Sequence, residues 1–418
     1  MRVHLSNLGC KLNQAEIESL ARQFTARGHR VVSSIEAADV HVINSCTVTH
    51  VADRSSRKLA RKASRIDATI KTVITGCYAT AAADEAAQLH GVNLVVDNTD
   101  KAQLVDAVVN AFPELANSEP ESAFPYGESA TASSRSRVAV KIEDGCNMNC
   151  SFCIIPMTRG SQVSRPAEDI KREVAQLVSA GYQEVILTGV QISSYRWQEM
   201  RLFDLVVAVL PVMQSARLRL TSIAPWNFDP RLLDLLRDGS VCPHVHLSLQ
   251  SGYDRTLDRM KRPYSMDDFE VLVDAIRQAQ PETAITTDVI VGFPGETSAD
   301  FDRSLDNVTQ LGFAKIHAFP YSIRPGTTAA LLENQVQPQV MRARMQQMLE
   351  VAEHAEQDFY QQQQGRQLQV LWESLNADTM HGTSCNYVKV RGQLDHQRLG
   401  TLRNEHIRPG EDGQLWAA

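Results

Sequence analysis

Three cysteines within eight residues constrain this chain more than any other feature of its sequence. Cys146, Cys150 and Cys153 stand in the order C-x3-C-x2-C. Three thiolates so close together can hold three irons of a [4Fe–4S] cluster and leave the fourth iron open to a small molecule. A structural zinc site usually pairs two C-x2-C arms, and an iron–sulfur electron carrier normally adds a fourth nearby cysteine. The run has neither, so it predicts a cluster with one open iron.

A second set of three cysteines lies in the first eighty residues. Cys10, Cys46 and Cys77 each come just after a short apolar run, and helical patterns over 14–27 and 48–66 separate those runs. This βαβ alternation predicts a parallel sheet covered by helices, in which ligands bind beyond the carboxyl ends of the strands. Three strand ends can bring three thiolates together, which predicts a second three-cysteine cluster. Buried hydrophobic cysteines are the alternative, but they belong inside strands.

The bulk composition is that of a globular protein. The chain has 418 residues, 43% of them hydrophobic, which predicts about two to four domains. It opens without a signal peptide, and no apolar run approaches the roughly 20 residues of a membrane span. Eight cysteines with metal-type spacing and no secretory signal favour a cytoplasmic protein that contacts no membrane.

A block of basic residues follows Cys46 at intervals of three and four. On a helix this spacing places most of them on one stripe. A solvated face is the usual fate of such charges, but basic residues with no acid among them repel one another unless an anion approaches. A phosphate backbone is such an anion, although the net charge of −7 does not itself indicate nucleic-acid binding. We expect nucleic acid at these residues: Arg54, Arg57, Lys58, Arg61, Lys62 and Arg65.

Changes of pattern divide the chain into four segments. Residues 1–112 form the N-terminal α/β domain, and 113–137 form a linker rich in Ser, Pro, Glu and Ala. Residues 138–364 alternate strand and helix patterns, which predicts a parallel barrel or part of one, with six βα units and its chemistry at the carboxyl ends of the strands. Residues 365–418 alternate like strands between glycine turns and predict a small all-β barrel. The six expected barrel strands are 138–142, 184–187, 218–221, 245–249, 285–291 and 314–319.

Glycines and small polar residues end several of these strands. Glycine lets a backbone approach a ligand closely because no Cβ intervenes. Ordinary strand-to-helix turns are the alternative, but in a barrel these ends face one shared mouth. We therefore expect cofactor contacts from Gly189, Ser248, Gln250, Gly292, Pro294, Gly295 and Glu296.

The sequence resembles the methylthiotransferase family of radical S-adenosylmethionine (radical SAM) enzymes over essentially its full length. The resemblance lies in short segments around the cysteines and the strand ends. They are LGCKLNQ at 8–14, NSCTV at 44–48, TGCY at 75–78, DGCN to CIIP at 144–156, RG at 159–160, SLQSG at 248–252, GFPGET at 292–297 and FPYS to RPGT at 319–327.

The resemblance implies a fold and a chemistry. The central segment becomes a partial, TIM-like radical SAM barrel whose cluster cleaves S-adenosylmethionine reductively, and the C-terminal barrel becomes a TRAM-like module that contacts RNA. The cluster on Cys10, Cys46 and Cys77 carries the sulfur that is donated. One S-adenosylmethionine methylates that sulfur, and a second yields a 5′-deoxyadenosyl radical that removes a ring hydrogen from the substrate, where the methylthio group joins. We expect no conventional acid–base pair to dominate.

Cofactors and partners follow from the same resemblance. The cofactors are two [4Fe–4S] clusters and S-adenosylmethionine. The partners are tRNA, an electron donor such as a flavodoxin or ferredoxin, and a sulfur source. A two-cluster electron-transfer protein is the non-enzymatic alternative.

The substrate is a finer question, because family members act on adenosine derivatives at tRNA position 37 or on an aspartate of a ribosomal protein. The phrase GCKLNQ at 9–14 resembles the branch that methylthiolates C2 of N6-threonylcarbamoyladenosine, whereas the N6-isopentenyladenosine branch shows Gln-Met-Asn there. Ser45, Thr80 and Ala224 depart from the family pattern. Cys242 and Cys385 match no ligand motif, and we predict that they only pack.

Overall fold

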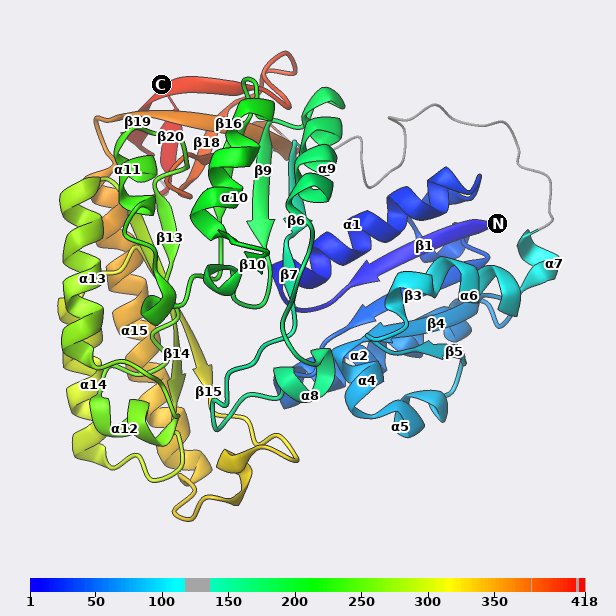
Figure 1. The fold of residues 1–418 in the computed structure, drawn as a ribbon, viewed down its shortest axis with the longest axis horizontal. Helices are drawn as coiled ribbons and strands as arrows, with labels where there is room; N and C mark the ends of the chain where they lie inside the picture. Colours follow the sequence, from blue (N-terminus) through cyan, green and yellow to red (C-terminus); the bar gives the residue numbers. More distant parts are fainter. Residues whose placement is uncertain (117–135, 377, 411–412, 418) are drawn as a thin grey trace.

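The computed structural model describes residues 1–116, 136–376, 378–410 and 413–417. Within them the chain forms an N-terminal parallel sheet, an open central barrel and a closed C-terminal barrel (Figure 1). The mixed α/β fold class predicted from the sequence is confirmed. Most of the predicted linker, residues 117–135, lies outside the described residues, and its first four residues form a short helix, α7 (Pro113–Ala116). No described helix is long and apolar enough to cross a membrane.

The N-terminal sheet has the strand order β2-β1-β3-β4-β5, and every neighbouring pair is parallel. Its central strands are almost wholly buried because helices cover both faces. One face packs on α1 and α6 and the other on α2, α4 and α5. The strands are β1 (Arg2–Asn7), β2 (Arg30–Val32), β3 (Val40–Ser45), β4 (Lys71–Gly76) and β5 (Val92–Val96). The helices are α1 (Lys11–Ala26), α2 (His50–Ala60), α3 (Lys62–Ile66), α4 (Cys77–Ala81), α5 (Ala83–Ala87) and α6 (Leu104–Ala111).

The single helix expected over 48–66 is wrong in two respects. The Thr49 side chain accepts a hydrogen bond from the amide of Ala52, which caps α2 and leaves Val48 outside the helix. The chain then turns at Arg61, which separates α2 from α3. The basic residues are therefore divided between two short helices.

The central domain is a barrel that does not close. Its six parallel strands form two three-stranded sheets, β12-β9-β6 and β13-β14-β15, and a single bridge between Ile223 and Leu247 joins them. No ladder joins β6 to β15 in the described part of the chain. The strands are β6 (Arg137–Lys141), β9 (Glu184–Thr188), β12 (Arg217–Leu220), β13 (His244–His246), β14 (Ala284–Val291) and β15 (Lys315–Pro320). The predicted partial barrel is confirmed, with strand boundaries shifted by at most three residues.

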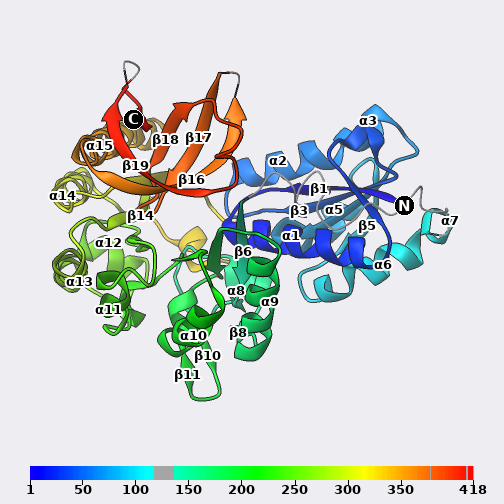
Figure 2. The ribbon, with the colours of Figure 1, turned by 90° about the horizontal axis from the view of Figure 1, so that it is seen from above.

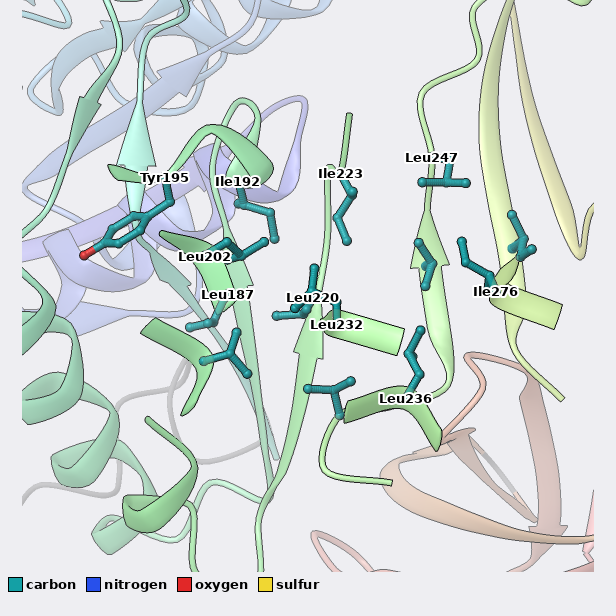
Figure 3. Close-up of a cluster of buried hydrophobic side chains, with 14 of the residues drawn as sticks. Leu187, Ile192, Tyr195, Leu202, Leu220, Ile223, Leu232, Leu236, Leu247 and Ile276 are labelled. Carbon is teal, nitrogen blue, oxygen red and sulfur yellow. The ribbon is translucent and has the colours of Figure 1, made fainter. Parts of the chain in front are cut away.

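Alternate residues of these strands face two different environments. The apolar set packs under the surrounding helices, as with Leu187 and Leu220 against Leu232 and Leu236 (Figure 3). The opposite set faces the lumen and is largely polar, since strand side chains alternate between faces. It includes Glu184, Arg219, His244, His246 and Asp288. The covering helices are α9 (Ala167–Ser179), α10 (Leu202–Val209), α11 (Leu232–Arg237), α12 (Asp254–Arg259), α13 (Met266–Ala279), α14 (Ser298–Gln310) and α15 (Pro338–Gln362).

The C-terminal barrel closes in the order β16-β17-β18-β20-β19 around Trp372, which is fully buried. A Cβ on Gly392 would lie 2.6 Å from the Trp372 ring, so the ring requires glycine there. Tyr387 turns the chain with φ +70°, and the next strand starts only at Lys389. The strands are β16 (Gln367–Asn376), β17 (Thr379–Ser384), β18 (Lys389–Gln393), β19 (Leu402–Pro409) and β20 (Leu415–Ala417).

The C-terminal barrel lies against the central domain (Figure 2), and buried charges join the two. Glu184 is wholly buried and pairs with Arg217 at 2.5 Å and Arg219 at 3.0 Å. The two guanidiniums also donate to main-chain carbonyls of β16, β17 and the turn after β17. The Arg219 guanidinium lies 4.9 Å from the centre of the Tyr387 ring, which stacks on His244. This end of the lumen is therefore capped by the C-terminal barrel.

Candidate functional site

The C-x3-C-x2-C run lies in the loop that follows β6 and β7 (Glu143–Asp144) and precedes α8 (Ile155–Arg159). Gly145 starts the loop with φ +70°, and a Cβ there would lie 2.2 Å from the Ser161 carbonyl oxygen. The amide of Cys146 donates to the Gly160 carbonyl at 3.1 Å. Contacts between the two ends of the loop therefore hold the first cysteine in place.

Ser151 fixes the middle of the same loop. Its amide donates to the Met260 carbonyl at 3.0 Å, and its hydroxyl donates to the Arg259 carbonyl at 2.7 Å. Its own carbonyl accepts from the amide of Ala329 at 2.7 Å. Two other loops of the barrel mouth therefore hold the segment between Cys150 and Cys153.

The second cysteine set lies at the carboxyl ends of three strands of the N-terminal sheet, as predicted. Cys10 precedes α1, Cys46 follows β3, and Cys77 opens α4 directly after β4. A Cβ on Gly9 would lie 2.7 Å from the Cys46 sulfur, so the chain before Cys10 passes against that thiol. Three separate strands thus bring three thiols to one region.

Each set supplies three thiols, the donor type that holds an iron–sulfur cluster. Burial raises the pKa of Cys46 to about 11, and the neighbouring Cys77 and Cys10 thiols raise it further. Burial raises the pKa of Cys153 to about 12, and Cys150 and Cys146 add to that increase. Such thiols stay protonated unless a metal displaces their protons. No three His, Cys, Asp or Glu side chains among the described residues converge as a single-ion site would require.

Asn98 links one cysteine set to the helix that follows the other, and no sequence pattern indicated it. Its side-chain amide lies 3.8 Å from the Cys77 sulfur and donates to the Thr158 carbonyl at 2.7 Å. Thr158 belongs to α8, which begins two residues after Cys153. Asn98 therefore joins the N-terminal domain to the central domain beside Cys77.

Glu16 is the centre of a buried charge cluster at the same boundary. Its carboxylate accepts from Lys101 at 2.7 Å, Arg159 at 3.0 Å and Lys141 at 3.2 Å. Arg159 also pairs with Asp144 at 2.9 Å. Burial alone would raise the pKa of Glu16, but the three cations outweigh it and hold that pKa well below its usual range. Arg159 lies in the family-like segments, whereas Glu16 and Lys101 are ordinary helical charges in the sequence.

Two of the residues predicted to contact cofactor lie against charged side chains of the protein. Glu296 pairs with Arg344 at 2.7 Å and accepts from the amide of Gly292 at 3.1 Å. A Cβ on Gly295 would lie 2.0 Å from an Arg259 guanidinium nitrogen, so glycine there makes room for that arginine. Glu296 and Gly295 thus shape the loop after β14, which also contains buried Pro294.

The other predicted contacts lie at the ends of β9 and β13. Gly189 leaves room for the carboxylate of Glu143, which would lie 2.2 Å from a Cβ at that position. The carbonyl and hydroxyl oxygens of Ser248 accept from Arg262 at 2.7 and 3.1 Å. Gln250 has a left-handed backbone with φ +73°. These residues surround the same barrel mouth as the cysteine loop.

Glu143 is a buried carboxyl group beside the cysteine loop. One oxygen accepts from the amide of Gln191 at 2.5 Å, and the other has no hydrogen-bond partner among the described residues. Burial raises the pKa of Glu143 to about 7, although the Gln191 amide opposes that shift. Gln191 in turn lies 3.9 Å from the Cys146 sulfur.

The basic block lies on α2 and α3. Five of its members are exposed, whereas Arg57 is half-buried, pairs with Glu85 at 3.3 Å and lies over the Tyr78 ring at 5.8 Å. The exposed members are Arg54, Lys58, Arg61, Lys62 and Arg65. Cys242, outside both cysteine sets, is buried, and Cys385 is half-buried.

Two adjoining hollows lie on the C-terminal barrel, and one of them is also lined by the N-terminal and central domains. They have volumes of about 470 and 320 Å³ and share Glu373 and Ser374 in their walls. Lys11 and Arg137 line one hollow, and the other contains the cations Lys389 and Arg391. Lys11 directly follows Cys10, so this polar surface begins beside the N-terminal cysteine site.

Comparison with family models agrees with this arrangement. The model described as the radical SAM superfamily matches residues 140–308. The model described as "Uncharacterized protein family UPF0004" matches residues 2–97.

Several curated proteins resemble the chain along nearly all its length. The threonylcarbamoyladenosine tRNA methylthiotransferase MtaB of Chlamydia pneumoniae is 36% identical and covers 92% of this chain and 89% of its own. The protein of the same name from Thermotoga maritima is 34% identical and covers 99% and 96%. A tRNA-2-methylthio-N(6)-dimethylallyladenosine synthase of Methylacidiphilum infernorum is 32% identical and covers 93% and 88%.

Among solved structures, the radical S-adenosylmethionine methyltransferase TsrM from Kitasatospora setae, with cobalamin and a [4Fe-4S] cluster bound, superimposes with a TM-score of 0.60. The match covers 78% of this chain and 76% of that one at 14% sequence identity, so it reports on the fold alone.

Replacing Glu16 by Gln is expected to lower the free energy of unfolding of the cluster-free protein by about 3 kcal/mol, because three buried cations lose their carboxylate. Urea unfolding monitored by circular dichroism measures this loss. The matched control is Arg22→Gln, which removes a partly exposed ion pair to Glu173 across the same boundary and should cost less than about 1 kcal/mol. Equal losses of unfolding free energy in the two variants would show that the buried Glu16 cluster stabilises the protein no more than a partly exposed ion pair does.

The raised pKa of Glu143 predicts a pH-dependent loss of stability. The carboxyl group ionises near pH 4.5 when unfolded but near pH 7 when folded, so its contribution is fully present below pH 4.5 and is lost as the pH rises to about 7. Glu143→Gln stays neutral, so its unfolding free energy relative to the wild type should increase between these pH values. Urea titrations from pH 4.5 to 8 test this, with the exposed residue Glu168 changed to Gln as the control. A difference that does not vary with pH would contradict it.

Proposed function

The chain belongs to the methylthiotransferase family of radical SAM enzymes, and we propose that it methylthiolates C2 of N6-threonylcarbamoyladenosine at position 37 of tRNA. It is an enzyme that transfers a methylthio group, and its cofactors are two [4Fe–4S] clusters and S-adenosylmethionine. The observation that carries the proposal is that Asn98 links Cys77 to the helix that directly follows the C-x3-C-x2-C loop.

Each cysteine set is assigned one cluster. Cys146, Cys150 and Cys153 hold the cluster of the barrel mouth, and Cys10, Cys46 and Cys77 hold the other. When bound, the first cluster supplies reductive cleavage of S-adenosylmethionine, and the second supplies a place for the sulfur that is transferred. The chain itself orients these groups and excludes water. An external one-electron donor such as a flavodoxin or ferredoxin and a separate sulfur source complete the reaction.

The polar lumen supports the threonylcarbamoyl substrate over a prenylated one. His246 lies 3.3 Å from an Asp288 carboxylate oxygen, and its other ring nitrogen contacts the Thr286 hydroxyl at 3.0 Å. The His317 ring lies 6.2 Å away from that of His246. The threonylcarbamoyl group carries a carboxylate, a hydroxyl and a urea, which can form hydrogen bonds with such side chains. An isopentenyl group has none of these and requires an apolar binding surface. The names of the relatives quoted above with the highest identity agree with this choice.

RNA contact is assigned to two surfaces. Lys11 and Arg137 line the hollow between the three domains, Lys389 lines the adjoining hollow of the C-terminal barrel, and Lys11 directly follows Cys10. The exposed cations of α2 and α3 provide a second basic surface on the N-terminal domain. Phosphate contacts of this kind position RNA without reading its sequence.

Nucleoside mass spectrometry of tRNA from cells lacking the protein tests the reaction. The wild-type gene should restore the methylthio group on threonylcarbamoyladenosine, and Cys150→Ala and Cys46→Ala should not. Purified Cys46→Ala should still form 5′-deoxyadenosine from S-adenosylmethionine, whereas Cys150→Ala should not. Cys385→Ser, outside both sets, serves as the control and should behave like the wild type.

Other outcomes identify the alternatives. Loss of the methylthio group from the prenylated nucleoside alone would assign the protein to the other tRNA branch, and loss from neither nucleoside would leave a ribosomal-protein substrate. Failure of the reduced wild-type protein to form 5′-deoxyadenosine would favour an electron-transfer protein.

The salt dependence of tRNA binding separates the two RNA surfaces. Replacing Lys11 and Lys389 by Gln should weaken binding and reduce the slope of log K against log salt by about 1 to 2, because each phosphate contact releases counterions. The corresponding pair Arg54→Gln and Lys58→Gln tests the helical surface by the same measurement. Lys171→Gln, on α9, is the matched control. An unchanged slope in either double variant would remove that surface from the RNA interface.

A further inference from the structure

Arg262 lies beside the cysteine loop in a position that the proposed reaction does not yet explain. It belongs to the connection between α12 and α13, and only 8% of its surface is exposed. Its guanidinium lies 4.4 Å from the centre of the Trp226 ring and 5.4 Å from that of Tyr264. The two rings stack nearly parallel, with 12° between their planes. The cation is therefore held in a fixed orientation by aromatic side chains.

The hydrogen bonds of this guanidinium lead to the cysteine loop and to Ser248. One nitrogen donates to the Cys150 sulfur at 3.4 Å. A second donates to the carbonyl and hydroxyl oxygens of Ser248 at 2.7 and 3.1 Å, and the third lies 3.5 Å from the Tyr264 hydroxyl. All three guanidinium nitrogens are engaged, and among their partners the Cys150 sulfur is the one that becomes a thiolate when it binds a metal.

A buried guanidinium without a counter-charge is strongly destabilising. The other arginines with buried side chains among the described residues have carboxylates: Arg159 has Glu16, Arg217 and Arg219 share Glu184, Arg324 has Asp53, and Arg344 has Glu296. None of the ion pairs found in the same part of the chain involves Arg262.

We propose that Arg262 tunes the cluster held by Cys146, Cys150 and Cys153, raising its reduction potential through the hydrogen bond to the Cys150 sulfur and through its positive charge. This inference rests on the cluster ligands assigned above. Reduction adds one electron from an external one-electron donor to the cluster and forms no bond, so the reduced cluster is more negative. A fixed cation and an N–H donor to sulfur stabilise the more negative state.

Arg262 is thus a positioning residue that links two parts of the mouth. The same guanidinium holds the end of β13 at Ser248 and the middle of the cysteine loop at Cys150. Ser151 also joins the cysteine loop to the end of α12, just before Arg262: its amide donates to the Met260 carbonyl and its hydroxyl donates to the Arg259 carbonyl. The sulfur–arginine distance is therefore set by several independent contacts.

The test measures the reduction potential of a single cluster. In the full-length chain, Cys10, Cys46 and Cys77 are replaced by Ala, so that only the barrel cluster is reconstituted, with about four irons per chain. Anaerobic redox titration followed by electron paramagnetic resonance gives its midpoint potential. Arg262→Gln should retain the iron and make reduction about tenfold less favourable, a shift of about −59 mV for one electron. Arg262→Lys keeps the positive charge but loses the branched guanidinium, so its midpoint potential should lie between those of the parent protein and Arg262→Gln.

Arg255→Gln is the matched control, because Arg255 lies on α12 nearby and pairs with Asp300 on the surface. Its potential should equal that of the parent protein. A wild-type potential in iron-replete Arg262→Gln would overturn the proposal, as would loss of the cluster in both Arg262 variants when circular dichroism shows them folded. If only Arg262→Lys retains iron, a midpoint potential equal to that of the parent would also overturn the proposal, and a lower midpoint potential would support it. Failure of the parent to bind iron would instead refute the ligand assignment.

Discussion

The buried carboxylate of Glu16 is the interaction on which the arrangement of the site depends. It gathers Lys101 from its own domain and Lys141 and Arg159 from the barrel. α1, which carries Glu16, begins directly after Cys10, and Arg159 ends the helix that follows Cys153. Because buried charges are tolerated only when they are paired, the cations and the carboxylate must meet for either domain to be stable here. Electrostatic pairing therefore fixes the position of one cysteine set relative to the other.

The N-terminal domain also contacts elements on both sides of the gap that the strands of the central barrel leave open. On one edge α1 packs beside β6, and Arg22 pairs with Glu173 of α9. On the other edge Arg324, in the loop after β15, donates to the Thr47 carbonyl at 2.9 Å and pairs with Asp53 at 2.7 Å. Thr47 directly follows Cys46. The domain that carries the second cysteine set thus covers the β6 edge of the open barrel and contacts the loop that follows β15.

Local patterns predicted the strands, most helices and the position of all six cysteines, because periodicity and strand ends are properties of short segments. The charge clusters were not predictable in this way. Glu16 meets Lys141 and Arg159, which are 125 and 143 residues away, and Arg262 meets Cys150 across 112 residues. The loop GFPGE was predicted to contact cofactor, but its glutamate is paired with Arg344 from α15, a partner that no local pattern indicates. The break at Arg61 and the turn at Tyr387 likewise depend on residues packed against them.

The polar lumen explains why the C-terminal barrel belongs to the central fold and is not a detachable module. Arg217 and Arg219 place two buried guanidiniums at the end of the lumen opposite the cysteine loop, and Glu184 supplies one carboxylate for both. Their remaining donors are satisfied by the carbonyls of Gln369, Thr383, Ser384 and Cys385. Unsatisfied buried donors are costly, so the lumen can keep its charged lining only with the C-terminal barrel in place. The C-terminal barrel is thereby fixed at one end of the lumen, and the loop with Cys146, Cys150 and Cys153 lies at the other.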